Sequence, residues 1–354
     1  TGAADADYTC KRPVAVTLRN MTGSTPQWGI ASADVLVEGV TEGTTASLMA
    51  LYANPDSIAK AGPVGPARDL LLQVALPLNA VPVHIDKNIY ASNLLNTLAY
   101  QDLDGYHIGK TAFAFDQDRQ NAGYAEENCW YTTGELIRNG AASYGTALEG
   151  SNTPLFRFGA REEVAPENRS GMSLTVTFSK SDSEQLNYNT GTGLYEKLNA
   201  DGSPMTDADN GQQAAFTNVF VLYASSGIKD DGYTRQYDMT GGTGLYLHGG
   251  AWEQISWSKE DATGLPFNSI FAILLENDHP STPLVNAGAI AACSMVKPIA
   301  DPENKWKAIV DNITDLCGSA PQLIDELYKS ESETNFNNRS ITCLLYTSPS
   351  PRDA

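Results

Sequence analysis

The chain has 354 residues, of which 42% are hydrophobic and 18% are charged, so it can bury a sizeable core and is not globally disordered. Asp and Glu together number 42 against 23 Lys and Arg, which gives a net charge of -19. A chain this acidic repels nucleic acid and anionic lipid head groups, which excludes both as expected partners and leaves solubility as the simplest role of the charge.

The first part of the chain, 1–165, combines short apolar strands with helices. Each predicted strand is an apolar run rich in β-branched residues, and these runs cover 13–18, 33–38, 46–52 and 81–85. Residues 69–75 have helical spacing and are predicted to form a helix. Another helix is expected to begin after Thr133, because a hydroxyl there can cap free backbone amides.

The second part, 170–260, is predicted to contain only strands. They are expected at 174–178, 218–223 and 252–257, the last of which would end the sheet. Two similar segments, 192–195 and 243–246, are interpreted as hairpin turns. Gly242 and Gly244 lack the third glycine and the following helix of a dinucleotide fingerprint, so they too are interpreted as part of a turn.

After Lys259 the pattern becomes helical. Residues 287–296 are small and apolar and are predicted to form a fully buried helix, and helical periods follow at 306–313 and 323–328. The change comes without a Gly/Ser/Pro linker, which indicates an artificial join. The expected fold class is α+β. It comprises a mixed α/β N-terminal part (1–165), a β-rich part (170–260) and a helical fragment (262–341).

The ends of the chain and its cysteines indicate little chemistry. No apolar run reaches the ~18 residues that a membrane-spanning helix needs. The sequence opens at Thr1 without an initiator Met or a signal peptide, so we expect a mature terminus or a truncation. The five cysteines show no zinc-type spacing, and no metal or cofactor is predicted. Cys10 and Cys129 could form one disulfide in an oxidising compartment, and whether they pair stays open.

A collinear series of motifs runs through residues 12–259. It includes Arg12-Pro13-Val14-Ala15-Val16, Pro26-Gln27-Trp28-Gly29-Ile30, Gly62-Pro63-Val64, Asp231-Gly232 and Trp257-Ser258-Lys259. In this series the chain resembles the YerB-like lipoprotein family, DUF3048, across its N-terminal and C-terminal parts. The resemblance implies an extracytoplasmic, membrane-anchored lipoprotein of the bacterial cell envelope, for which no reaction is established.

Two departures from that family affect a potential anion site. Gly65-Pro66 stands where the family usually carries Arg-Ser, and Asp86-Lys87-Asn88 follows His84 where the family tends to have glycines. An anion site built on paired arginines in this loop is therefore weakened.

The best candidate polar cluster lies at the ends of apolar elements, where loops hold functional groups on a rigid frame. It consists of Arg68, Asp69, His84 and Asp86. The structural alternative is a buried, satisfied histidine beside a surface pair of Arg68 and Asp69. Two acidic pairs could gather a divalent cation, but they lack calcium-loop spacing and a closing Glu, so solvated loops are expected. These pairs are Asp102 with Asp104 and Asp116 with Asp118.

The segment 262–341 carries Gly264-Leu265-Pro266-Phe267-Asn268-Ser269 and the run Asn286-Ala287-Gly288-Ala289. With these motifs it resembles the serine-dependent glutaminase family, which has a β-lactamase-like fold. The resemblance implies that L-glutamine is the substrate and that it is contacted by Asn286, Glu331 and Asn338. Alternatively, or in addition, Asn286 caps the start of the buried helix.

The nucleophile of that family is missing, so no catalytic residue is predicted. Glutamine hydrolysis requires a Ser activated by a Lys one helical turn later, upstream of the Gly264 motif. Ser294 with Lys297 has the right spacing, but it lies after Asn286 on what should be a core helix and is interpreted as a coincidence. We also expect 262–341 to pack poorly, because isolated helices bury too little surface.

Two functions follow from these patterns. The first is an extracytoplasmic binding or structural module for a small-molecule or cell-envelope ligand. The alternative is a glutaminase that converts L-glutamine to L-glutamate and ammonia, whose parent protein would be cytoplasmic. The last residues, 342–354, are interpreted as a non-native tail, since 344–353 resembles translated sequencing adapter.

Overall fold

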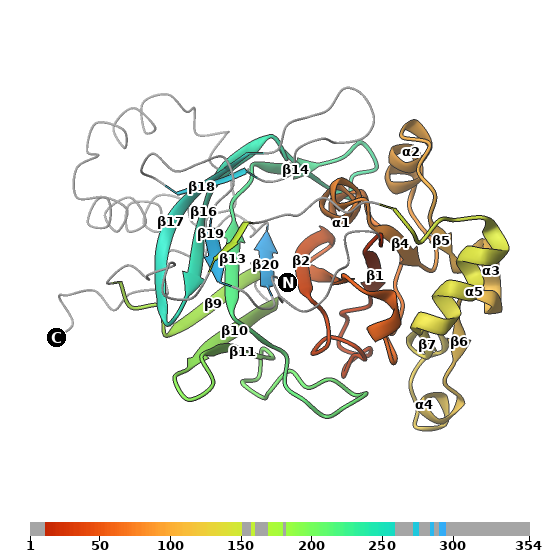
Figure 1. Ribbon diagram of the computed structural model, residues 1–354, viewed down its shortest axis with the longest axis horizontal. Helices are drawn as coiled ribbons and strands as arrows, with labels where there is room; N and C mark the ends of the chain where they lie inside the picture. Colours follow the sequence, from red (N-terminus) through yellow and green to blue (C-terminus); the bar gives the residue numbers. More distant parts are fainter. Residues whose placement is uncertain are drawn as a thin grey trace.

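The computed structural model describes residues 11–150, 157–159, 169–179, 182–258, 272–275, 284–286 and 290–294. Its centre is a ten-stranded sheet (Figure 1). From one edge to the other the strands are β18 (Ala272–Leu275), β17 (Ala251–Ser258), β16 (Gly241–His248), β13 (Asn218–Leu222), β20 (Ile290–Ser294), β2 (Val35–Glu42), β3 (Thr45–Tyr52), β1 (Val14–Leu18), β4 (Val81–His84) and β5 (Leu103–Asp104).

The pairing in this sheet is mixed. β1 runs antiparallel to β3 and parallel to β4, and β4 runs parallel to β5. Helix α2 (Ile89–Thr97) lies between β4 and β5 in the chain, as a parallel connection requires. At the centre, β20 is parallel to both of its neighbours, β2 and β13.

Smaller elements surround the central sheet. A four-stranded sheet has the order β12 (Ala215–Phe216), β11 (Leu194–Leu198), β10 (Asp182–Asn189) and β9 (Ser173–Ser179). Three two-stranded pairs are β14 (Ser226–Ile228) with β15 (Arg235–Tyr237), β6 (Ala114–Phe115) with β7 (Trp130–Tyr131), and β8 (Arg157–Gly159) with β19 (Leu284–Asn286). The other helices are α1 (Asp69–Ala75), α3 (Gly105–Ile108), α4 (Gln117–Asn121) and α5 (Gly134–Tyr144), with 3-10 turns at Pro55–Ser57, Leu76–Leu78, Gly109–Thr111 and Glu126–Asn128.

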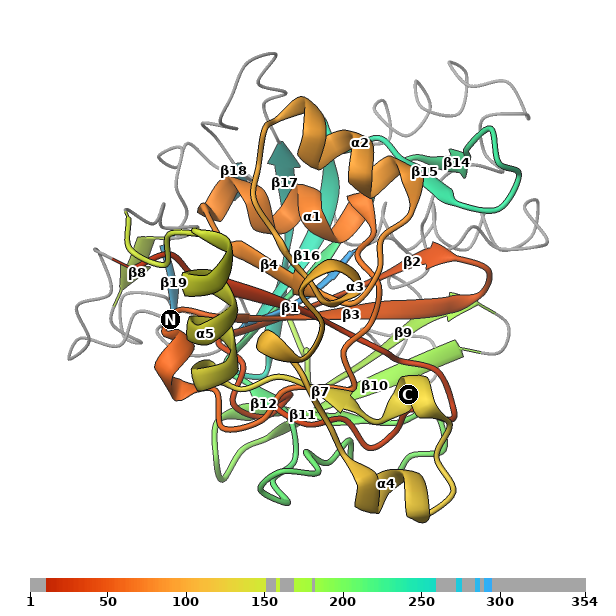
Figure 2. The same cartoon turned by 90° about the vertical axis from the view of Figure 1, so that its right-hand side faces the viewer.

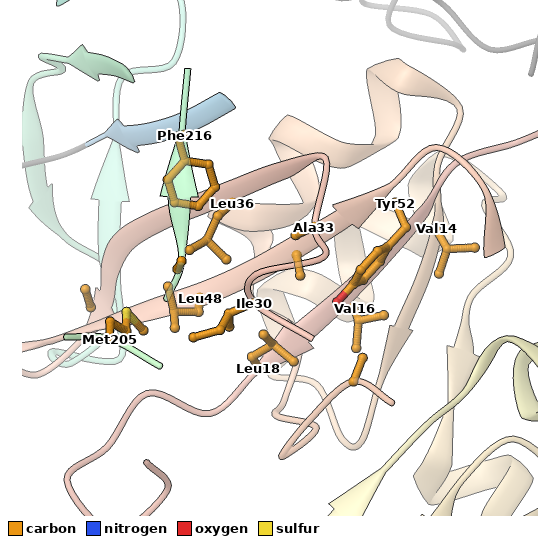
Figure 3. Packing of buried hydrophobic residues seen from close by; sticks show 14 of the residues in the cluster. Val14, Val16, Leu18, Ile30, Ala33, Leu36, Leu48, Tyr52, Met205 and Phe216 are labelled. Carbon is orange, nitrogen blue, oxygen red and sulfur yellow. The ribbon is translucent and has the colours of Figure 1, made fainter. Parts of the chain in front are cut away.

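The two faces of the central sheet pack against different partners. Along β1 the buried side chains alternate, with Val14 and Val16 in one core and Ala15 in the other. The first core lies between the central sheet and the four-stranded sheet and includes Phe216 (Figure 3). The second core includes Leu71 of α1. Figure 2 shows the consequence, with α1 on one side of the sheet and β10, β11 and β12 on the other.

These elements confirm the expected α+β class and most of the predicted strands. The runs at 13–18, 33–38, 46–52 and 81–85 form β1, β2, β3 and β4, and the helix predicted over 69–75 is α1. Thr133 caps α5, because its hydroxyl accepts a hydrogen bond from the amide of Leu136. Residues 192–193 form a turn between β10 and β11, as expected.

The turn predicted at 243–246 is wrong, because these residues lie inside β16. Gly242 and Gly244 serve close strand packing instead of a turn. A Cβ atom at Gly242 would lie 2.1 Å from the carbonyl oxygen of Tyr223, and one at Gly244 would lie 2.4 Å from that of Val221. Close backbone approach is the other common reason for glycine in a strand.

The buried helix predicted over 287–296 is also wrong, since Ile290–Ser294 forms β20. Short runs of small apolar residues do not distinguish a buried helix from a buried strand, and here two flanking strand edges decide the outcome. β17 is not the last strand, because β18 pairs with it. The helical periods at 306–313 and 323–328 lie outside the described residues.

The central sheet draws strands from all three expected parts of the chain, while the division at residues 165 and 260 stays a prediction. Buried polar contacts also join these parts. Lys197 of β11 contacts Glu38 of β2 at 2.9 Å and also pairs with Glu184 of β10. None of the described helices has the length and apolar character needed to cross a membrane. Cys129 is buried, and Cys10 lies outside the described residues, so their pairing is untested.

Candidate functional site

The predicted polar cluster separates into pairs. The guanidinium of Arg68, at the start of α1, donates to both carboxylate oxygens of Glu42, at 2.5 Å and 3.0 Å. Asp69 forms an ion pair with Lys229, which follows β14. Both pairs are largely shielded from solvent, with side-chain exposures of 13–21%. The structural alternative, in which Arg68 and Asp69 form an exposed surface pair, is therefore wrong for these two residues.

His84 lies in a separate network at the end of β4. Its Nε2 is 2.9 Å from a carboxylate oxygen of Asp102, and its Nδ1 is 2.9 Å from the carbonyl oxygen of Asp86. Lys87 completes the network, with its Nζ 2.6 Å from Asp102 and 3.2 Å from Asp104. Because both ring nitrogens face oxygen acceptors, an imidazolium, which carries N–H on both nitrogens, satisfies both contacts.

The electrostatics of this network favour ionised carboxylates. Burial raises the pKa of Asp102, but hydrogen bonds from His84 and Lys87 outweigh it and lower that pKa from 3.8 to about 2. Burial likewise raises the pKa of Asp104, and the charge of His84 together with two backbone amides brings it below the ordinary value. Asp86 takes part through its backbone, which has a left-handed φ of 73°.

His84, Asp102 and Asp104 present ligand atoms within 4.8 Å of one another, a set that could hold a metal ion. The ammonium of Lys87 already contacts both carboxylates, so the chain itself supplies the positive charge there. The expectation of solvated loops is wrong for this acidic pair, because Asp104 is buried and Asp102 is half-buried. It also fails for Asp116, which pairs with Lys60 at 2.5 Å.

A cavity of about 360 Å³ opens beside Arg68. It lies at the end of β1 and the turn between β2 and β3, with the turn between β14 and β15 alongside. Its polar lining includes Thr17, Arg19, Thr41, Glu42, Ser47 and Arg68. The hydroxyls of Thr41 and Ser47 are 2.6 Å apart. We refer to this space as the arginine cavity.

Arg19 is the unusual member of the arginine cavity. Its guanidinium makes no hydrogen bond or ion pair within the described part of the chain, and its Nε is buried without a partner. Its backbone is fixed, because the amide donates to the carbonyl of Pro63 at 2.8 Å. Burial lowers the pKa of Arg19 while the charge of Glu127 opposes that effect and Arg68 adds to it.

Arg19 also borders a second cavity, of about 220 Å³, which includes Glu127. Gly65 packs against its side chain, since a Cβ atom there would lie 3.2 Å from the Arg19 Cγ. Gly65 stands where the family usually has an arginine, and its loop therefore contacts another arginine, Arg19, which follows β1. Sequence reasoning missed Arg19 and Glu42, although each ends a buried strand, which is a place where functional side chains collect.

Of the three predicted glutaminase-type residues, the described structure includes one, Asn286. Asn286 ends β19 and pairs with Gly159 of β8, and most of the helix that it was expected to cap, 287–296, is replaced by β20 over Ile290–Ser294. Glu331 and Asn338 lie outside the described residues. Contact of these three residues with L-glutamine stays a prediction.

Comparisons with known families agree with the two-part character of the sequence. The family described as "Protein of unknown function (DUF3048) N-terminal domain" matches residues 1–147, and its C-terminal counterpart matches 174–267. The chain contains both domains of the DUF3048 family. A crystal structure of the YerB protein from Bacillus subtilis has the same fold, with a TM-score of 0.69 and 22% identity, over 81% of this chain and 91% of that one.

The glutaminase family matches residues 248–349. A glutaminase from Bacteroides thetaiotaomicron is 78% identical over 96 residues, and one from Parabacteroides distasonis is 79% identical over 96 residues. Each alignment covers 27% of this chain and 30% of the relative. The chain thus carries a partial glutaminase domain and spans less than a third of these enzymes.

Proposed function

We propose that the DUF3048 part of this chain is an extracytoplasmic binding module of the bacterial cell envelope and that its ligand occupies the arginine cavity. The observation that carries the proposal is the guanidinium of Arg19, which lines the cavity and has no hydrogen bond or ion pair among the described residues. More than nine in ten buried polar groups in proteins have a partner, and an unpaired buried donor costs stability. Because Nε itself is closed to solvent, a ligand in the cavity would pair with the outer nitrogens of this guanidinium, which also have no partner among the described residues.

The size and construction of the cavity support the same function. Small-molecule sites typically enclose roughly 300–1,000 Å³ and present a few fixed polar groups, and the arginine cavity encloses about 360 Å³. Its walls are the ends of β1, β2 and β3, which pack into the main core and do not depend on a ligand for their position. A rigid frame with a polar opening is the arrangement expected of a binding protein.

Thermal unfolding with a panel of charged and neutral small molecules tests this function, since a ligand that binds the folded state raises the Tm. Thr44 lies exposed at the cavity, so Thr44→Trp should obstruct it without disturbing the core. Thr111→Trp, at an exposed position that does not line the cavity, is the control. Ligand stabilisation that persists in Thr44→Trp would exclude the cavity as the site. An alkaline phosphatase fusion to the parent gene tests separately whether the protein is extracytoplasmic.

Glutamine hydrolysis is the second candidate, and high identity to glutaminases over 96 residues favours it. The missing nucleophile argues against it. Ser294, which is three residues before Lys297, ends the central strand β20 and follows Asn286, whereas the family's nucleophile precedes the motif that begins at Gly264. We expect the purified chain to release no ammonia from L-glutamine above the blank. Turnover that survives Ser294→Ala would require another nucleophile, and turnover abolished by it would restore the enzyme hypothesis.

A further inference from the structure

We propose that the ligand of the arginine cavity carries an anionic oxygen group, a carboxylate or a phosphate, and that Arg19 is the residue that binds it. This inference rests on the proposed function and adds the chemical class of the ligand. It follows from the charges at the cavity, from the donors that remain unused and from the lack of an internal partner for Arg19.

The charges at the cavity do not balance. The lining of the cavity contains two guanidinium groups, of Arg19 and Arg68, and one carboxylate, of Glu42. Glu42 is fully engaged by Arg68 through two parallel hydrogen bonds, and Arg68 also donates to the carbonyl of Ala67 at 2.9 Å. Within the lining of this cavity one positive charge is therefore left over, on Arg19, which also lines the second cavity with Glu126 and Glu127.

The chemistry of arginine limits the class of ligand. A guanidinium offers five N–H donors and no acceptor, and its planar fork matches the two oxygens of a carboxylate or phosphate. Hydrogen bonds between such charged partners are roughly twice as strong as neutral ones. A neutral ligand could accept a hydrogen bond but would leave the guanidinium of Arg19 without a charged partner in contact with it.

No acidic side chain of the described chain takes this role. Glu127 lies in the smaller adjacent cavity and acts on Arg19 through its charge, but the two form no ion pair. Asp86 acts on Arg19 in the same way, also without a contact. The net charge of -19 means that an anion meets repulsion over most of the molecule, so a local excess of positive charge is needed to hold it.

Neutral donors that line the same cavity fit the same ligand. Thr41 and Ser47 share one hydrogen bond at 2.6 Å, which leaves the hydrogen of one hydroxyl for a ligand at the cavity. Thr41 is itself buried, at 3% exposure, and its position is therefore fixed. An anion at Arg19 would gain charge-assisted hydrogen bonds from the guanidinium and an additional one from this hydroxyl pair.

Isothermal titration of the full chain with inorganic phosphate, succinate and glucose tests the inference. Phosphate or succinate should bind and glucose should not, and the stronger of the two anions identifies the type of group. Arg19→Gln should lower the affinity for the anion by roughly tenfold or more, which is the effect expected from losing a charge-assisted hydrogen bond. Arg19→Lys should retain part of the affinity. Arg138→Gln, which removes an exposed arginine paired with Asp56, should change it less than twofold.

Three results have distinct meanings. Equal anion affinity in wild type and Arg19→Gln, with both variants folded by their Tm, would overturn the role of Arg19. Binding of glucose alone, abolished by Thr44→Trp, would overturn the anionic class while leaving the binding function in place. Failure of every charged and neutral probe to bind at the cavity would remove both proposals.

Discussion

The buried lysine between the two sheets is the strongest test of how the parts of this protein are held together. Lys197 is 1% exposed and its ammonium pairs with Glu38, which is 2% exposed, and with Glu184, which is 9% exposed. Substituting Lys197→Met keeps most of the apolar stem, so packing changes little. The variant instead leaves two neighbouring carboxylates without their cation in a site closed to water.

Removing one partner of a buried ion pair typically costs roughly 3–5 kcal/mol. We expect a value near the upper end, about 4–5 kcal/mol, because one lysine serves two carboxylates. Urea unfolding followed by tryptophan fluorescence should show a lower midpoint with an unchanged slope. Adding Glu38→Gln and Glu184→Gln to the variant should recover most of the loss, since the unpaired charges are then gone.

Lys11 provides a matched control. Its Nζ is 2.9 Å from Asp56, the same separation as between Lys197 and Glu38, but its side chain is 40% exposed. Lys11→Met should therefore cost no more than about 1 kcal/mol. A loss below 1 kcal/mol for Lys197→Met, or no recovery in the triple variant, would refute the view that uncompensated buried charge sets the penalty.

Other substitutions test the remaining polar contacts. The folded-state pKa of Asp102, about 2, lies below the ordinary 3.8, so this group contributes stability above pH ~4 that is lost as the pH falls toward 2. Asp102→Asn should cost about 2 kcal/mol at pH 7 and much less near pH 2, measured by urea unfolding at both values. The buried carboxylate of Asp207 accepts the amides of Gly29 and Ala31 at 3.0 Å and 2.9 Å. Asp207→Asn, which turns an NH₂ group toward an amide donor, should lower stability by about 2 kcal/mol, and an unchanged urea midpoint would contradict this role.

The sequence predicted the fold best where the residue pattern is compatible with only one kind of secondary structure. β1 to β4 and α1 were found because apolar runs and helical spacing there agree with local propensity. The errors fall where the same residues suit two structures. Gly242 and Gly244 suit a turn or a close strand contact, and only the position of the neighbouring carbonyls decides between them.

The candidate site was predictable only in part, because pairing is a property of the folded chain. Arg68 and His84 were correctly singled out as polar groups at element ends, yet their partners Glu42 and Asp102 come from distant segments. Arg19 is not part of any motif recognised in the sequence. What distinguishes it is the absence of an acceptor around its guanidinium in the described structure, which no local pattern reports.

The position of β20 in the central sheet gives the glutaminase-like segment a structural role. Without Ile290–Ser294, the edges of β2 and β13 would lose their shared partner in the middle of the sheet, and unpaired strand edges promote aggregation. The fragment therefore completes the DUF3048 sheet even if it catalyses nothing. Limited proteolysis should yield a stable product that keeps Ile290–Ser294, either in one chain or as a nicked fragment that stays bound. A stable, monomeric core that ends near residue 260 and has lost this strand would show that β2 and β13 do not need it.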